Sequence, residues 1–247
     1  ATISGTSFDE NSNASGVKET KIAAYHYNLA KYWNGADWAA SSQCWTTATP
    51  LTSGNTIWQF VKPWSWSEVQ YDVYSQVTDN AGNISSHIST STFKIDSSSP
   101  TSTVTSHNNL SAYSAAPTAA VAISGASNDA NTVNTVKVYI RQNINTDGNY
   151  RWWNAGTPAF DSTSEIYWSA TNVNPWSYSP PALTGARFTS GATYYAYTSA
   201  WDNAGNVEST PGAGAKTFIW DVTPPTSTVL NQQVISGYVN SLATISG

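Results

Sequence analysis

The chain has 247 residues, of which only 10% are charged, and its formal net charge is −5. About a quarter of the residues are charged in an ordinary soluble protein, so Ser, Thr, Asn and Gln must provide most of the solubility here. The few basic residues are scattered, which excludes the clustered positive surface of a nucleic-acid-binding protein. A single cysteine excludes a disulfide within the chain, and no apolar run approaches the ~20 residues of a membrane span.

The first half of the chain carries strand signals. We expect a strand over residues 1–5 and further strands over 70–77 and 91–95, where β-branched and aromatic residues alternate with polar ones. The sequence Asp-Asn-Ala-Gly-Asn, which begins at Asp79, separates the last two strands. Asn and Gly tolerate positive φ angles, so this pentapeptide predicts a hairpin turn.

The second half repeats this pattern with more strands. We expect strands over residues 101–105, 120–124, 135–141, 193–200 and 216–220. The last two are again joined by Asp-Asn-Ala-Gly-Asn, at residues 202–206. No segment shows the 3.6-residue apolar period of a helix. Short strands separated by turn residues predict an all-β fold of tandem, immunoglobulin-like antiparallel β-sandwiches.

The recurrences have a spacing of about 120 residues, which indicates tandem modules. We expect repeat 1 at residues 1–99, lacking its first strand, repeat 2 at 100–224, complete, and the first strands of a third repeat at 225–247. Ile-Ser-Gly occurs once in each of these segments. Two explanations for the partial repeats stay open. The chain is a slice of a continuous array, or the tail completes repeat 1 of a neighbouring copy by strand addition.

Two motifs identify the type of module. Asp-Asn-Ala-Gly-Asn is followed by Phe-x-x-Asp and by Pro-Thr-Ser, with Phe93 and Asp96 in repeat 1 and with Phe218 and Asp221 in repeat 2. This pair resembles bacterial immunoglobulin-like repeats. The resemblance implies a spacer, stalk, filament or adhesin extender of a large secreted or cell-surface protein, with neighbouring copies of the module as partners. Some relatives stiffen their junctions with calcium.

An enzymatic role is not indicated. The three histidines, His26, His87 and His107, do not recur between the repeats, and no His/Cys cluster has the spacing of metal ligands. No nucleophile motif or phosphate-binding glycine loop is present. We therefore expect a non-enzymatic protein without a cofactor, with calcium at the module junctions as the one candidate.

Recurring aspartates are the candidate calcium ligands. Asp96 in the linker, Asp129 in the loop after the second strand and Asp202 in the final hairpin turn of repeat 2 are expected near one another. Repeat 1 offers Asp9 or Glu10 and Asp79 at matching positions, and Asp221 repeats Asp96. Calcium takes six to eight oxygen ligands, which loop carboxylates and carbonyls can supply. The alternative is that these aspartates only stabilise turns.

Tryptophan is the second unusual feature. Trp33, Trp38, Trp45 and Trp58 have approximate counterparts at Trp152 or Trp153, Phe160, Trp168 and Trp176, which favours a role in packing. Trp64 and Trp66 have no tryptophan counterparts in repeat 2. Alternate residues share one face of a strand, so these two rings could form an exposed platform that stacks on surface glycans. The alternative function is therefore a carbohydrate-binding module.

Overall fold

The computed structural model describes residues 2–9, 15–52, 54, 56–108, 111–143 and 150–228. The strands expected for a third repeat beyond Thr228 lie outside these residues. The chain divides into two compact units. Unit 1 comprises Ala1–Ser98 with Ala204–Asn206, and unit 2 comprises Ser99–Asn203 with Val207–Gly247.

Unit 2 is a β-sandwich of two sheets. One sheet has the order β10-β12-β17, and the other has the order β11-β19-β18-β13-β14-β15, with β16 also paired to β13. The strands of the unit are β10 (Thr101–Val104), β11 (Ala112–Tyr113), β12 (Ile123–Asn128), β13 (Val133–Asn143), β14 (Tyr150–Asn154), β15 (Ala159–Ser162), β16 (Trp168–Ser169), β17 (Trp176–Tyr178), β18 (Thr193–Asp202) and β19 (Lys216–Trp220). The pairs are antiparallel except β11–β19. A short 3-10 helix, Gly185–Arg187, precedes β18.

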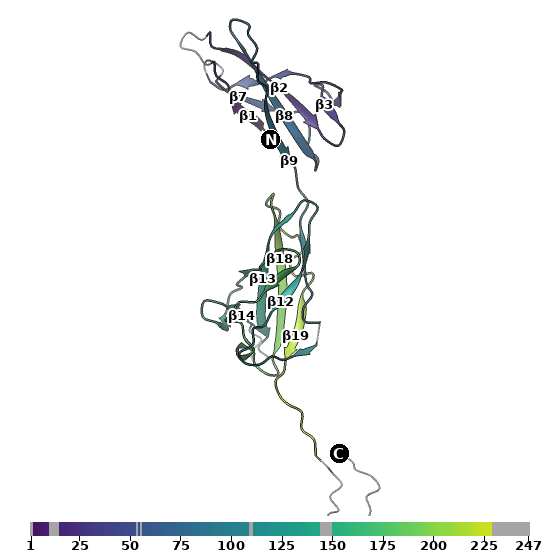
Figure 1. Ribbon diagram of the computed structural model, residues 1–247, viewed down its shortest axis with the longest axis vertical. Helices are drawn as coiled ribbons and strands as arrows, with labels where there is room; N and C mark the ends of the chain where they lie inside the picture. The colour runs from purple at the N-terminus through teal and green to yellow at the C-terminus, as the bar shows by residue number, and fades with distance from the viewer. Residues whose placement is uncertain are drawn as a thin grey trace, which may run out of the picture. The chain divides into compact units, whose positions relative to one another are not determined.

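Unit 1 repeats this architecture. Its sheets have the orders β1-β7-β6 and β4-β3-β2-β8-β9, with β5 paired to β2. The strands are β1 (Thr2–Thr6), β2 (Val17–His26), β3 (Lys31–Trp33), β4 (Trp38–Ala40), β5 (Thr46–Thr47), β6 (Thr49–Pro50), β7 (Ile57–Val61), β8 (Gln70–Asp79) and β9 (Ser89–Lys94). The long pair β2–β8 corresponds to β13–β18 of unit 2 (Figure 1). No α-helix occurs among the described residues, and the predicted all-β fold of tandem sandwiches is confirmed.

The core of unit 2 lies between its two sheets. The burial pattern of β13 alternates because successive side chains of a strand point to opposite faces. Val136, Val138 and Ile140 therefore point inward, where they join Ile123 and Trp176 of the facing sheet. Each of these five side chains is at most 1% exposed. Full burial of such a side chain stabilises the fold by about 1.5–3 kcal/mol, so the alternating pattern specifies both the strand and its register.

The repeated Ile-Ser-Gly sequence has a packing explanation. Gly5 of β1 pairs with Trp58, and Gly125 of β12 pairs with Trp176. A Cβ atom on either glycine would lie 2.4 Å from Cζ2 of the paired indole. Both units thus pack a buried tryptophan against a glycine backbone, where no larger residue fits.

The recurring aromatic residues are structural, with one change of alignment. Trp33 pairs with Trp38 and Trp153 pairs with Phe160, so these residues are true counterparts. The predicted match of Trp45 with Trp168 is wrong. Lys21 pairs with Thr47 and Lys137 with Ser169, so the counterpart of Trp45 is Tyr167.

Most strands match their predicted bounds to within two residues, but one is shifted further. The expected strand at residues 120–124 runs instead from Ile123 to Asn128, as β12. Glycine is depleted in strands, so a strand is expected to end near Gly125. Gly125 nevertheless lies inside β12, and the position is glycine because the indole of Trp176 takes up the space that a side chain would need.

Candidate functional site

Two of the predicted calcium ligands lie at one end of unit 2. Asp129 follows β12 and Asp202 ends β18, and a carboxylate oxygen of one lies within 4.8 Å of a carboxylate oxygen of the other. Asp202 is only 2% exposed. The Oδ2 atom of Asp129 accepts hydrogen bonds from the backbone N–H groups of Asn131 (2.6 Å) and Thr132 (2.9 Å). Its Oδ1 atom is buried and has no hydrogen-bond partner.

The two linker aspartates have equivalent turn contacts. Asp96 lies two residues beyond β9, and its Oδ1 atom accepts the backbone N–H of Ser98 (3.2 Å). The backbone carbonyl of Asp96 accepts a hydrogen bond from the Asn206 side chain (3.2 Å). Asp221 follows β19 and accepts the backbone N–H of Thr223 (2.9 Å) in the same manner. Asp96 and Asp221 therefore each stabilise a turn in the backbone.

In unit 1, Asp9 and Asp79 line one cavity of about 150 Å³. Their carboxylates already have partners. Asp9 accepts the backbone N–H of Gly16 (3.0 Å), and Asp79 accepts both the backbone and side-chain N–H groups of Asn83 (2.7 Å each). The hydrogen bonds from Asn83 lower the pKa of the Asp79 carboxyl group. These aspartates stabilise the loops at this end of unit 1.

The predicted sugar-stacking platform at Trp64 and Trp66 is wrong. Trp64 is 7% exposed and packs in the core of unit 1 against Trp33, while its ring meets Trp66 edge to face at 83°. The residues between β7 and β8 are not a strand, so the rule that alternate side chains share a face does not apply to them. These tryptophans fill the core and present no flat pair to solvent.

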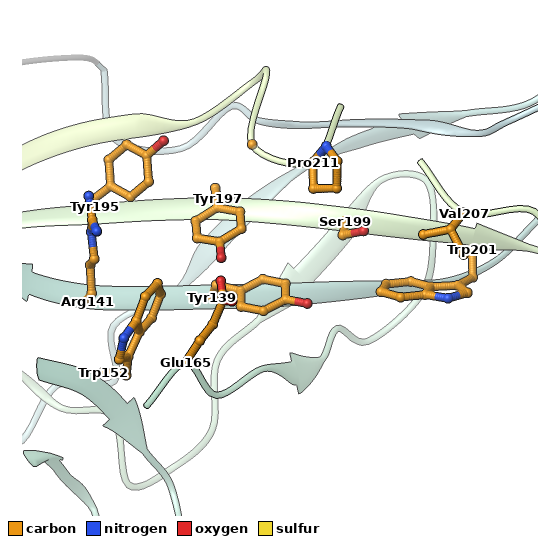
Figure 2. A pocket seen from close by; sticks show the side chains of 11 residues that line it. Tyr139, Arg141, Trp152, Glu165, Tyr195, Tyr197, Ser199, Trp201, Val207 and Pro211 are labelled. Atoms are coloured by element: carbon orange, nitrogen blue, oxygen red, sulfur yellow. The ribbon is translucent and has the colours of Figure 1, made fainter. Parts of the chain in front are cut away.

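The sequence did not indicate an open groove of about 610 Å³ on the outer face of the β13–β18 sheet in unit 2, which we call the outer-face groove. Tyr139 and Tyr197 stack at its centre, with ring centroids 4.5 Å apart and planes at 5°. Figure 2 shows Arg141 and Tyr195 at one end and Trp201 at the other. The remaining lining residues are Trp152, Glu165, Ser199, Val207, Pro211 and Gly212.

Cations and aromatic rings alternate along this face. The guanidinium carbon of Arg141 lies 3.7 Å from the ring centroid of Tyr150 and 4.6 Å from that of Tyr195. The Lys137 ammonium lies 3.9 Å from the Tyr167 centroid and 3.8 Å from the Trp201 centroid. Burial, together with the nearby Glu165 charge, raises the pKa of Tyr139, so its hydroxyl is protonated at neutral pH and can donate a hydrogen bond.

Alternating tyrosines at residues 193–197 were the available sequence signal for the groove. By themselves they indicate only a strand, because a binding surface also needs the residues of β13, and the pairing of β13 with β18 is not visible in the sequence. The cross-strand pairs Tyr139–Tyr197 and Arg141–Tyr195 create the surface.

No protein-family model and no curated protein matches the sequence. Among solved structures, the chain is similar to the fibronectin(III)-like modules of CbhA from Clostridium thermocellum, with a TM-score of 0.41, 13% identity and coverage of 92% of this chain and 90% of that chain. It is also similar to a tetra-tandem repeat in the extending region of a large adhesion protein, with a TM-score of 0.32, 15% identity and coverage of 88% and 44%. A third is the FN1-FN3 domains of chicken CNTN1, with a TM-score of 0.34, 12% identity and coverage of 89% and 62%.

At these TM-scores the comparisons assign neither a family nor a function. The fold follows from the strand order and register of the chain itself. No helix among the described residues is long and apolar enough to cross a membrane.

Proposed function

We propose that this chain is a non-enzymatic, extracellular structural repeat that acts as a stalk, filament or adhesin extender. The observation that supports the proposal best is the recurrence of one sandwich twice in the chain, with the same glycine–tryptophan pair at Gly5–Trp58 and Gly125–Trp176. Modules that each have a core contribute length in a near-additive manner. Neighbouring copies of the same module are the expected partners, at the cell surface or in a secreted protein.

A force-bearing spacer should unfold one module at a time. When the chain is pulled from its two ends between marker domains in a single-molecule experiment, we expect two separate unfolding events. Unit 1 should release roughly 320–350 Å of chain and the larger second module, residues 100–224, roughly 410–450 Å, since an extended residue spans about 3.3–3.6 Å. A single event that releases both units together, or unfolding without a force peak, would contradict the proposal.

Self-assembly by strand addition has less support as an alternative. In unit 2, β10 lies against β12 and is held by the buried carboxylate of Glu208. In unit 1, β1 corresponds to β12, and the position of Glu208 is occupied by Ser85, whose side chain accepts the backbone N–H of Val77 instead (3.2 Å). A strand like β10 added to β1 would lack the acceptor that fixes it in unit 2.

We also propose calcium binding at Asp129 and Asp202, with Asp96 as the third ligand that the sequence suggests. The unpartnered Oδ1 atom of Asp129 and the short separation of the two carboxylates support the proposal. Two close carboxylates repel each other, and a divalent cation would remove that repulsion.

Calcium is therefore expected to raise the melting temperature of the chain, and chelator is expected to reverse the rise. Asp129→Asn should abolish the calcium effect, because an amide offers one neutral oxygen in place of the carboxylate. Asp79→Asn in unit 1 is the matched control and should leave the effect in place. Equal melting temperatures in calcium and in chelator would show that these aspartates act only in turns.

A further inference from the structure

We propose that the outer-face groove of unit 2 binds an acidic oligosaccharide. This inference goes beyond the structural role of the chain and concerns a different surface from the tryptophans of unit 1. The groove has a volume of about 610 Å³, within the range of ligand sites, and it is open to solvent. An open groove accommodates part of a longer chain, such as a polysaccharide, without requiring a chain end.

The corresponding face of unit 1 carries different side chains, so the lining of the groove is particular to unit 2. There, Asp72 occupies the position of Tyr195, and its carboxylate accepts hydrogen bonds from Tyr27 (3.1 Å), Tyr74 (3.1 Å) and Thr92 (2.5 Å). Asp72 is 7% exposed and burial raises the pKa of Tyr74, which indicates a surface whose polar groups satisfy one another. Unit 2 has Tyr195 and Arg141 instead, and the aromatic rings of its outer face remain partly exposed.

Aromatic rings line the groove along its length. Tyr195, Tyr197 and Trp201 come from one face of β18, and Tyr139 from the facing position on β13. All four side chains are partly exposed rather than part of the core. The ring centroids of Tyr195 and Tyr197 lie 5.7 Å apart, so successive units of an extended sugar chain can each meet a ring. The C–H face of a pyranose ring can pack on an aromatic face, while tyrosine hydroxyls and Glu165 can bond to the sugar hydroxyls.

The charges of the groove favour an acidic sugar. Arg141 and Lys137 both lie on this face, and Glu165 is the one acidic side chain among the lining residues. The Nε atom of Arg141 is buried without a hydrogen-bond partner. A planar guanidinium held between aromatic rings presents its N–H groups in a fixed geometry, which suits a carboxylate. Unit 1 has Tyr25 at the position of Arg141 and thus offers no cation there.

A peptide fits this surface less well. The floor of the groove consists of side chains on β13 and β18, two strands inside a sheet whose backbone groups are paired with each other. A bound peptide could not extend the sheet here, because strand addition requires a free edge. A proline-rich peptide that stacks on aromatic rings is the competing ligand, and the test includes it.

The whole chain should be applied to a glycan array that carries neutral glycans and glycans with uronic or sialic acid. We expect retention of acidic glycans. The acidic glycan that binds most tightly is then titrated by calorimetry. Its affinity for Tyr197→Ala and for Arg141→Gln should be at least tenfold lower than for the wild type. Tyr74→Ala, the matched change in unit 1, should bind as the wild type does. Melting curves and circular dichroism establish that each variant is folded. Because Arg141→Gln leaves every aromatic ring of the groove in place, it keeps the test valid if Tyr197→Ala does not fold.

Three results would overturn the proposal. The array retains no glycan above the level of the Tyr197→Ala variant; it retains neutral glycans as strongly as acidic ones; or a polyproline peptide binds the groove and displaces the glycan.

Discussion

Replacing Gly125 with alanine is expected to destabilise unit 2 by about 3 kcal/mol or to prevent its folding, at or above the upper end of the usual cost of overpacking. The added Cβ atom would lie 1.9 Å from the carbonyl oxygen of Thr103 and 2.4 Å from Cζ2 of Trp176. A side chain can rotate away from such a contact, but the Thr103 carbonyl belongs to β10, which pairs with β12. The backbone must therefore separate, and the ladder between these strands is lost. Urea unfolding followed by tryptophan fluorescence measures the change in free energy.

Gly5→Ala in unit 1 is the matched control. Its Cβ atom would also lie 2.4 Å from Cζ2 of the paired Trp58, but its three nearest neighbours are all atoms of that indole rather than backbone atoms. We expect a smaller loss of stability, because the ring can shift. If Gly125→Ala costs no more than Gly5→Ala, the close approach of β10 is not the reason for glycine at this position.

Replacing Glu208 with alanine should cost about 3–5 kcal/mol in the stability of unit 2, because each buried donor left without an acceptor costs about 1–3 kcal/mol. Glu208 is 4% exposed. Its carboxylate accepts the backbone N–H of Ser102 (3.0 Å), the hydroxyl of Ser102 (2.5 Å) and the backbone N–H of Ala200 (3.0 Å). Alanine would leave these buried donors without their acceptor and would release β10 from β18.

Two substitutions serve as controls for this effect. Glu208→Gln keeps one acceptor oxygen and should have an intermediate cost, while Ser85→Ala at the matching position of unit 1 should cost about 1 kcal/mol, the worth of one hydrogen bond. Chemical unfolding of the three variants measures the differences. A Glu208→Ala protein within 0.5 kcal/mol of the wild type, roughly the range of neutral surface changes, would mean that the network does not hold β10.

The strands and their order could be predicted where local chemistry decides them. β18 and β19 alternate β-branched or aromatic residues with polar ones. The Asp-Asn-Ala-Gly-Asn turn between β8 and β9 recurs between β18 and β19, so both hairpins follow from the sequence. The burial of Trp64 could not be predicted. It depends on the irregular path between β7 and β8, where the two-residue alternation of a strand does not hold.

The candidate sites were harder to predict from the sequence than the strands, because they depend more strongly on tertiary structure. Asp129 and Asp202 could be placed at one end of a sandwich because turns between consecutive antiparallel strands lie at known ends of the sheet. The outer-face groove could not be found in this way. It requires the register that places Tyr139 beside Tyr197 and Arg141 beside Tyr195, and residues so far apart in sequence are brought together only when β13 and β18 pair.

The central claim is that the two units are separate modules that provide length. The radius of gyration of the chain in solution, measured by small-angle X-ray scattering, tests it most directly. A single globule of 247 residues has a radius of gyration of about 18 Å. Two modules that act as a spacer should give a value well above 18 Å and a distance distribution with two maxima. A value near 18 Å with one symmetrical maximum would contradict the account.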